Sequence, residues 1–421
     1  MSLRIVPAGA SLSDIAASCD GVSLLSYNVL LPNSGDGWWV FKYYDGETPD
    51  AARSWSHRRA LLARQILGTG ADVVCLQEAR AESFDADFAF LTEAGYAAEI
   101  HRKSMLRPAT FWRTGAWEGV YTRHTDKVLG VILRARGKPE RVLGVLNVHL
   151  TAGPDPQRRF RQVFDALDQL RKDLKRHGVA PEDAAVVVCG DFNAGPAGSA
   201  TQHLLAGGTV DADFREPGWP DLSLSSKARQ HAFSPFAEVY QQALGQPPVT
   251  LIGSQVAGLM AEGQPTERLI AAIEAMFERF AGADGGMDAA AIDAWIQRIN
   301  RAPQRGSEHR KAAAVLAEAG RSVLSREDFV GVYRSELSEG KIWSVQHDLQ
   351  SCGLLPEGAR VPYTASLDRL YHTIGTLEAV AVWDPLTEAR RQELAATGLG
   401  LPNVWHPSDH VPLGAVVRWG S

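Results

Sequence analysis

Eight polar residues stand at or near the ends of short apolar runs in this sequence. In chain order they are Asn28, Glu78, His149, Asp191, Asn193, Asp368, Asp409 and His410. A lone buried Asn or His is more often a satisfied structural residue, but each buried polar group left unpaired costs about 1–3 kcal/mol. Ligands also tend to bind at the carboxyl ends of strands in open α/β sheets. We therefore expect the eight side chains to meet in one site.

The residue types in this set indicate chemistry on a phosphate. Asn28, Glu78, Asp191, Asn193 and Asp409 offer only hard oxygen ligands. Mg²⁺ and Mn²⁺ prefer such ligands, and one or two carboxylates with water can hold them against a phosphate. The sequence contains neither a G-x-x-x-x-G-K-[ST] loop nor a G-x-S-x-G elbow, which disfavours a P-loop NTPase and an α/β-hydrolase.

The remaining residues could act on the phosphate and on water. His149 and His410 could donate hydrogen bonds to phosphoryl oxygens where negative charge builds up. Asp368 could hold His410 in one tautomer and favour its charged form. Asp191 could orient and deprotonate a water for in-line attack on phosphorus. Taken alone, G-D-F-N-A-G-P could equally be an ordinary turn, because Gly, Asp, Asn and Pro are all good turn formers.

Composition and charge narrow the class of protein. The 421 residues are 45% hydrophobic and 22% charged, as in an ordinary globular protein. The net charge of −6 does not fit a non-specific duplex binder. Four widely spaced cysteines, two of them (Cys75 and Cys189) inside apolar runs, favour a reducing compartment. No apolar run approaches the ~18 residues of a membrane helix. We expect a cytoplasmic protein without integral membrane contact, and leave open an organelle-targeting segment removed from the N-terminus.

Short apolar runs alternate with helical stretches from residue 20 to 250, which predicts an α/β fold. The expected strands are 22–29, 72–76, 109–112, 129–134, 142–149, 185–189, 366–371, 379–383 and 413–418. Helices are expected at 56–67 and at 156–177, the second with a basic face that we interpret as solvated. Because 252–345 is Ala-rich and helical, we predict a catalytic domain formed by 20–251 and 346–421 and interrupted by a helical insert.

Six motifs in this order resemble the endonuclease/exonuclease/phosphatase superfamily: S-Y-N-V-L, C-L-Q-E, N-V-H-L, G-D-F-N-A, L-D-R-L-Y and S-D-H-V-P-L. Within it, the chain is most similar to the nocturnin and catabolite-repression deadenylase branch. Three further stretches carry that likeness: W-S-H-R-R at 55–59, D-P-L-T-E at 384–388 and L-P-N-V-W-H-P-S-D-H at 401–410. The resemblance covers residues 20–250 and 360–418.

The resemblance implies a four-layer α/β sandwich, in which two face-to-face mixed β-sheets are flanked by helices. To this fold the helical stretch adds an inserted all-α subdomain. The site residues that the resemblance implies are Glu78, Asn28 and Asp409 for the metal, and Asp191, Asn193, His149, His410 and Asp368 for catalysis. Glu78 would be the principal metal ligand, and Asp191 and Asn193 would position the water and the phosphate.

Three departures from the branch concern the substrate. Thr151 stands where nocturnin-like members usually carry a Lys, L-R-P-A-T replaces the usual Asp-Gly before the middle strand, and the basic residue upstream of the L-D-Y motif is absent. These losses weaken the case for a nocturnin-type nucleotide. Arg102 and Lys103 could contact phosphate instead. Trp38, in W-W-V-F at 38–41, could stack on a base or, alternatively, insert into lipid.

The insert resembles a pair of EF-hands that have lost their calcium ligands. In 280–291, Phe280 holds the first loop position and Ala291 the last, where a bidentate Glu is needed. In 317–328, Ala317 holds the first position. Calcium binding is therefore not expected. The helix–loop–helix packing could still serve as a lid, a dimer contact or a surface for a protein partner.

Together these features predict a Mg²⁺- or Mn²⁺-dependent phosphoesterase. Its expected activity is that of a 3′–5′ exoribonuclease of the deadenylase type, acting on an RNA 3′ end, or of a nucleotide phosphatase. One alternative is a phosphoinositide or sphingomyelin phosphodiesterase, and an abasic-site endonuclease is disfavoured by the acidic balance. Another is a non-enzymatic scaffold that binds a partner through the insert, against which the presence of Glu78, Asp191 and His410 argues.

Overall fold

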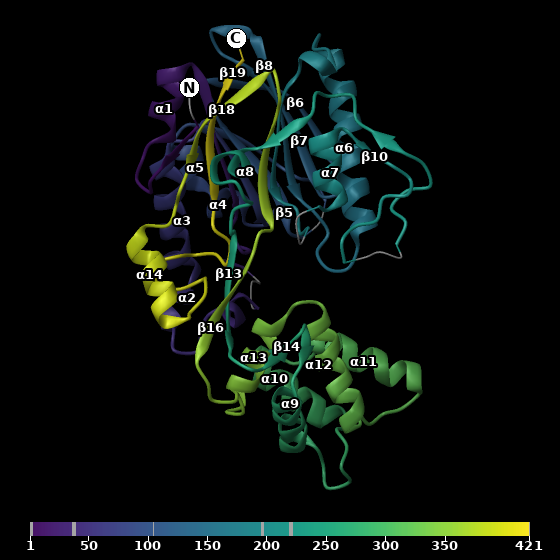
Figure 1. Ribbon diagram of the computed structural model, residues 1–421. Helices are drawn as coiled ribbons and strands as arrows, with labels where there is room; N and C mark the ends of the chain where they lie inside the picture. The colour runs from purple at the N-terminus through teal and green to yellow at the C-terminus, as the bar shows by residue number, and fades with distance from the viewer. Residues whose placement is uncertain (1–2, 36–38, 104, 195–197, 219–221, 421) are drawn as a thin grey trace.

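The computed structural model describes all residues except 1–2, 36–38, 104, 195–197, 219–221 and 421. Its larger body contains two β-sheets that lie face to face (Figure 1). The first has the spatial order β1 (Arg4–Val6), β18 (Leu377–Trp383), β19 (Leu413–Trp419), β2 (Gly21–Asn28), β3 (Val73–Ala79), β5 (Arg107–Arg113) and β4 (Tyr96–Ile100). The second has the order β12 (Phe236–Glu238), β17 (Asp368–Thr373), β9 (Ala185–Asp191), β8 (Lys138–His149), β7 (Val128–Ala135) and β6 (Trp117–Thr125).

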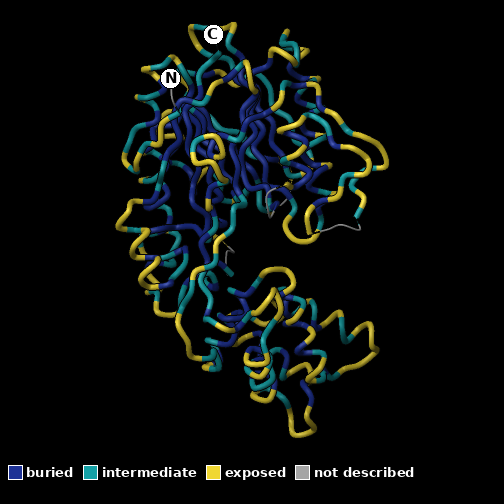
Figure 2. Tube along the Cα trace, in the orientation of Figure 1, coloured by how far each residue is buried: buried dark blue, intermediate teal, exposed yellow. Residues whose placement is uncertain are grey.

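The central strands are apolar on both faces because each face packs in a different core. In β2, Val22 and Leu24 lie in the core between the sheets, whereas Leu25 and Tyr27 lie in the core under the helices. Side chains alternate across a strand, so a strand covered on both sides reads as a continuous apolar run. Figure 2 shows the result as a band of buried chain through the centre of the larger body.

Helices cover the outer face of each sheet. The first sheet is covered by α1 (Leu12–Cys19), α3 (Trp55–Thr69), α4 (Phe84–Asp87) and α5 (Ala89–Glu93), and the second by α6 (Pro156–Arg176) and α7 (Ala200–Gly207). Helix α6 begins at a capped end, where Asp155 accepts a hydrogen bond from the Arg158 amide (3.0 Å). The order helix, sheet, sheet, helix confirms the four-layer α/β sandwich.

The smaller body lies below the sandwich in Figure 1 and is helical. Its helices are α9 (Glu267–Phe280), α10 (Ala289–Asn300), α11 (Ser307–Ala319), α12 (Arg326–Ser338) and α13 (Ile342–Ser351). Trp295, Phe329 and Tyr333 lie at the centre of its core and are fully buried. This core is separate from those of the sandwich, so the helices do not need a sheet to bury their apolar faces.

The two loops that resemble EF-hand loops pair with each other. Met287 and Leu324 exchange two backbone hydrogen bonds (3.0 and 2.9 Å) in an antiparallel bridge. Asp288 caps α10, and Asp328 forms a capping box with Ser325 at the start of α12. The two carboxylates therefore act as helix caps. The bridge supports an EF-hand-like pairing, which stays a prediction.

A two-stranded ribbon connects the two bodies. Strands β13 (Leu251–Val256) and β16 (Arg360–Ala365) are antiparallel, and their last paired residues are Val256 and Arg360. The chain thus enters and leaves the helical body at neighbouring positions. Residues 252–256, expected in the helical stretch, are strand because they pair with β16, and α13 continues past residue 345 to Ser351. The division into domains stays a prediction.

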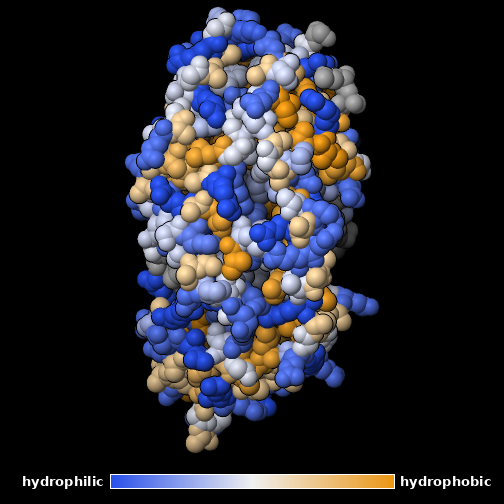
Figure 3. All heavy atoms as spheres, turned by 90° about the vertical axis from the view of Figure 1, so that its left-hand side faces the viewer, coloured by the Kyte–Doolittle hydropathy of each residue, from blue (hydrophilic) through white to orange (hydrophobic). Residues whose placement is uncertain are grey.

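The remaining elements are short. They are η1 (Val40–Tyr43), α2 (Asp50–Arg53), η2 (Pro181–Asp183), β10 (Thr209–Val210), β11 (Arg229–Gln230), α8 (Val239–Leu244), β14 (Met260–Ala261), β15 (Gln264–Pro265) and α14 (Glu388–Thr397). On the face that Figure 3 shows, the two bodies meet in one surface with hydrophilic and hydrophobic residues interspersed. Among the described residues, no helix is both long and apolar enough to cross a membrane.

Candidate active site

Three neighbouring strands of the second sheet place polar residues side by side. His149 at the end of β8 pairs in register with Asp191 at the end of β9, and Asp191 pairs with Asp368 at the start of β17. Neighbouring strands lie about 4.8 Å apart, so the three side chains share one sheet edge. Asn28 ends β2 and Glu78 lies near the end of β3, on the facing sheet. The structure therefore brings the strand-end residues of both sheets together.

A bulge directs Glu78 into this site. The pairing of β3 with β5 shifts register between Leu76 and Ala79, and Glu78 has φ +69°, which is uncommon for a residue other than Gly. Its carboxylate accepts hydrogen bonds from the Leu31 amide (3.1 Å) and from Asn28 Nδ2 (3.3 Å). The bulge thus turns this side chain out of the regular alternation of the strand.

Arg58, in the W-S-H-R-R stretch, joins the two loops that flank the site. Its guanidinium is fully buried and donates hydrogen bonds to the carbonyl oxygens of Val29, Leu30 and Leu31, at 2.8, 2.5 and 2.9 Å. It also donates to the carbonyl of Pro407 (2.9 Å), just before Asp409. Arg58 therefore positions the site without belonging to it, and sequence reasoning had noted it only as part of a family motif.

The turn after β9 fixes Asp191. Its carboxylate accepts hydrogen bonds from the Asn193 amide (2.8 Å) and from Asn28 Nδ2 (3.0 Å). Gly190 has φ +135°, and a Cβ there would lie 2.0 Å from the Val148 carbonyl oxygen. Only glycine fits this position. The Gly before the Asp is thus needed for strand packing, and the G-D-F-N stretch is both a turn and part of the site.

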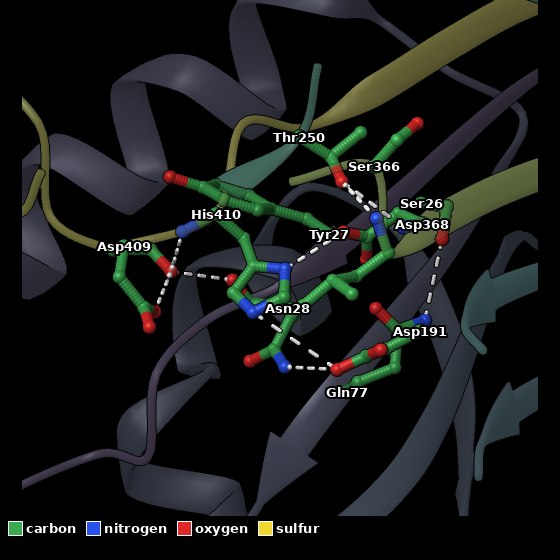
Figure 4. Close-up of polar contacts among 12 residues, drawn as sticks. Ser26, Tyr27, Asn28, Gln77, Asp191, Thr250, Ser366, Asp368, Asp409 and His410 are labelled. Atoms are coloured by element: carbon green, nitrogen blue, oxygen red, sulfur yellow. Dashed lines mark hydrogen bonds and ion pairs between the residues drawn. The ribbon is translucent and has the colours of Figure 1, made fainter. Parts of the chain in front are cut away.

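His410 and Asp368 form a buried pair (Figure 4). His410 Nδ1 lies 2.7 Å from Asp368 Oδ2, and Nε2 lies 4.0 Å from Asp191 Oδ2. Asp368 is held by a hydrogen bond from its amide to Thr250 Oγ1 (3.0 Å). Burial alone would lower the pKa of His410, but the charges of Asp368 and Asp409 outweigh it and raise this pKa well above the usual value. His410 is therefore a charged donor at neutral pH.

His149 differs from His410 in its charge. Burial lowers the pKa of His149 to about 4, so its imidazole is neutral at neutral pH. Its Nε2 lies 3.7 Å from Glu78 Oε1 and 3.9 Å from Asp191 Oδ2. The site thus combines one neutral and one charged imidazole, each with its Nε2 within 4.0 Å of Asp191 Oδ2.

Three carboxylates in the site favour a cation between them. Burial, together with the charges of neighbouring carboxylates, raises the pKa of Glu78 to about 7 and also raises the pKa of Asp191 and of Asp409. No three His, Cys, Asp or Glu side chains in the described ranges form a closed metal cage. Mg²⁺ does not need one, because it keeps several waters and takes one or two carboxylates. The donor set therefore fits a hydrated divalent cation.

The site opens into a cavity of about 600 Å³ that also borders Lys127. Lys127 stands in the tight turn between β6 and β7, with φ +59°, and its carbonyl accepts a hydrogen bond from the His149 amide (3.1 Å). Sequence reasoning missed this residue, because T-D-K-V reads as a surface turn. The signal that could have found it is the strand order. The strand after this turn, β7, runs antiparallel to β8, so the turn lies beside His149 at the end of β8.

Two predicted substrate residues lie outside this cavity. Arg102 and Lys103 are exposed and border a second cavity of about 730 Å³, which Lys127 also borders. Trp38 lies outside the described residues. The structure therefore does not bring Arg102 and Lys103 to the carboxylates, and a contact of either with phosphate stays a prediction.

Two other polar residues from the strand-end runs turn out to pair with each other. Gln77 Nε2 donates to Asn147 Oδ1 (2.8 Å), and Asn147 Nδ2 donates to the carbonyls of Leu76 and Ala109 (3.1 and 2.9 Å). This network ties the two sheets together behind the site. Both residues are therefore structural, although Gln77 Oε1 is buried without a hydrogen-bond partner among the described residues.

Comparisons with known proteins agree with this geometry. The model of the Endonuclease/Exonuclease/phosphatase family matches residues 25–410. The chain is 30% identical over 257 residues to Carbon catabolite repressor protein 4 homolog 2 of Arabidopsis thaliana, covering 49% of this chain and 40% of that protein. It is 35% identical over 278 residues to the CCR4-Not complex 3′-5′-exoribonuclease subunit Ccr4 of Schizosaccharomyces pombe, covering 50% and 38%. The aligned part is thus about two fifths of each relative's length.

The fold is also that of solved structures. ANGEL2, a 2′,3′-cyclic phosphatase solved in complex with adenosine-2′,3′-vanadate, superposes with a TM-score of 0.56 at 17% identity, covering 95% of this chain and 96% of that one. At this identity the likeness concerns the fold alone. The family match at 25–410 spans both segments of the sandwich and includes all eight strand-end residues. The chain belongs to the Endonuclease/Exonuclease/phosphatase family.

Proposed function

We propose that the chain is a Mg²⁺- or Mn²⁺-dependent phosphoesterase that removes nucleotides from an RNA 3′ end. The observation that carries this proposal is the convergence of three carboxylates with one neutral and one charged imidazole at a single cavity. The 35% identity to a protein named as a 3′-5′-exoribonuclease supports RNA as the substrate. The alignment covers only about two fifths of that relative's length. The choice of RNA as the substrate therefore also rests on the chemistry of the site.

Each side chain has a defined part in this reaction. Glu78 and Asp409, with Asn28 beside them, would hold the cation. The bound cation would neutralise phosphate charge and make a water more acidic. Asp191, kept in place by Asn28 and Asn193, accepts a proton from the water that attacks phosphorus.

Two imidazoles and one ammonium complete the phosphate site. His149, which is neutral, and His410, which is charged, donate hydrogen bonds to phosphoryl oxygens. Asp368 keeps His410 charged and oriented through the 2.7 Å contact. Lys127, which lines the same cavity, adds a second positive charge, and Thr151 stands where the branch usually carries a Lys.

The test is hydrolysis of a substrate panel with Mg²⁺ and with a chelator. The panel contains 5′-labelled oligo(A), mixed-sequence RNA, an abasic duplex, NADP and a phosphoinositide. Wild type is compared with Asp191→Ala and with Asp213→Ala, a control at an exposed carboxylate. Stepwise shortening of RNA that needs Mg²⁺, is lost in Asp191→Ala and is kept in Asp213→Ala supports the proposal.

Each other outcome would replace the proposal with a named alternative. Phosphate release from NADP alone would make the chain a nucleotide phosphatase. Cleavage of the phosphoinositide alone would indicate a lipid phosphodiesterase, and incision of the abasic duplex alone would indicate an endonuclease. Hydrolysis of none of the five would favour the non-enzymatic scaffold.

A further inference from the structure

The cavity that holds the site has walls from both bodies. It borders Glu78 and Asp191 of the sandwich and also Trp343 and Gln350 of α13. Tyr363 of the connecting ribbon lines the same cavity. A substrate whose phosphate lies at the carboxylates therefore extends toward the helical body.

Buried contacts fix the helical wall to the sandwich. Lys42 of η1 donates to Glu308 Oε1 (3.1 Å) and to Asp348 Oδ1 (2.9 Å), and all three residues are at most 4% exposed. Phe41 beside it lies under the Arg301 guanidinium, 4.1 Å from the ring centroid. The helices next to the cavity are thus held in place by charge and packing in this structure.

Three aromatic rings form what we call the aromatic shelf: Tyr43, Trp343 and Tyr363. Tyr43 and Trp343 are stacked, with ring centroids 3.9 Å apart and planes 20° apart. Tyr363 lies against Gly253, its partner on the neighbouring strand, where a Cβ would meet the Tyr363 Cζ at 2.0 Å. All three are half-buried and line the cavity. The shelf joins three segments that are far apart in the sequence.

Two side-chain amides line the same cavity as the shelf. Asn403 Oδ1 accepts hydrogen bonds from the amides of Trp405 and His406, at 3.1 and 3.0 Å. Its Nδ2 has no hydrogen-bond partner among the residues that the structure describes, and the same holds for the side-chain amide of Gln350. Both residues line the cavity. Aromatic rings and side-chain amides in one cavity suit a planar group with polar edges, which a lipid chain lacks.

We propose that the aromatic shelf binds the base of the nucleotide whose phosphate lies at Asp191 and Glu78. The position of the phosphate rests on the proposed function. The helical body is then a wall of the substrate site that selects for a base, and not only a surface for a partner. Stacking of a base on an aromatic side chain is sequence-tolerant, so the shelf favours nucleotides over other phosphate esters without choosing one base.

Calorimetric titration in Mg²⁺ tests this without relying on catalysis. The two probes are adenosine 5′-monophosphate and ribose 5-phosphate, which share the ribose and its 5′-phosphate but carry adenine or a hydroxyl at C1. Wild type should bind the nucleotide about 5- to 150-fold more tightly, the range expected for one stacked base. In Trp343→Ala the ratio of the two affinities should fall to within about twofold, and in Trp343→Phe most of it should remain.

Two further variants keep the test decisive. Trp419→Ala is the matched control, because Trp419 is also a half-buried stacked tryptophan, paired with Trp117 at 6.0 Å, but does not line this cavity. Tyr363→Leu removes a second ring of the shelf and should also reduce the ratio, which guards against a loss of folding in Trp343→Ala. Thermal melts of each variant identify such a loss.

The outcomes separate this inference from the proposed function. Equal binding of the two probes to wild type, or an unchanged ratio in both Trp343→Ala and Tyr363→Leu, overturns the shelf even where RNA is cleaved. A preference that these variants abolish supports the shelf even where no RNA is cleaved, and the proposed function alone then fails.

Discussion

Replacing Lys42 by Met tests how firmly the helical body is fixed to the sandwich. The Lys42 ammonium contacts the carboxylates of Glu308 and Asp348 where none of the three is more than 4% exposed. Burial alone would lower the pKa of Lys42, but the two carboxylates outweigh it and raise this pKa. The substitution leaves two buried carboxylates without their cation, which costs about 3–5 kcal/mol.

Native-state hydrogen exchange measured by mass spectrometry follows this change locally. A loss of about 3–5 kcal/mol speeds exchange of the amides in η1 and α13 by about 150- to 4000-fold. Amides at the centre of β9 should be nearly unchanged, because β9 lies in the sheet away from Lys42. The control Lys138→Met removes an exposed ion pair with Asp20 and should change exchange less than about fivefold.

Two results would refute this reasoning. Unchanged exchange in η1 and α13 would mean that packing alone holds the two bodies together. Equal acceleration in β9 would mean that Lys42 supports the whole fold and not one interface.

Three further predictions concern the site. Lys127→Ala should lower kcat/KM on RNA about 10- to 150-fold, the value of a hydrogen bond to a charged group, and Lys127→Arg should restore part of it. Asp368→Asn should lower kcat about 10²- to 10⁴-fold and shift the alkaline limb of the pH profile to lower pH, because His410 loses the partner that raises its pKa. The pKa of Glu78 rises from 4.5 to about 7 on folding, so the metal-free protein loses stability as pH rises between these values. Calorimetry should show Mg²⁺ affinity increasing about tenfold per pH unit up to about 7.

The buried strands could be predicted from the sequence, whereas the edge strands could not. Strands β2, β3 and β9 are apolar on both faces, so their runs are visible without knowledge of the fold. Strands β4 and β6 lie at the edges of their sheets and are mostly half-exposed, so polar residues interrupt them. The sequence Y-A-A-E-I gives no signal that separates an edge strand from a loop.

The candidate site divides in the same way. Asp191 and Glu78 could be expected together because they end apolar strands, and the ends of neighbouring strands meet at a sheet edge. The place of Lys127 in the site could not be predicted, because a lysine in a tight turn is most simply interpreted as exposed to solvent. The pairing of Tyr43 with Trp343 depends on how the helical body docks, and nothing local in either segment indicates it.

The ribbon explains how the helical body can adjoin the site without disturbing it. Because Val256 and Arg360 pair, the inserted chain begins and ends at adjacent points, and closing it adds little strain to the sandwich. The same strands contribute to the site itself: Thr250, just before β13, holds Asp368, and β16 carries Tyr363. Arg360 also pairs with Asp45 beyond η1 (3.0 Å). The connection and the cavity wall are therefore one structure, so the helices are better explained as part of the substrate site than as an appended module.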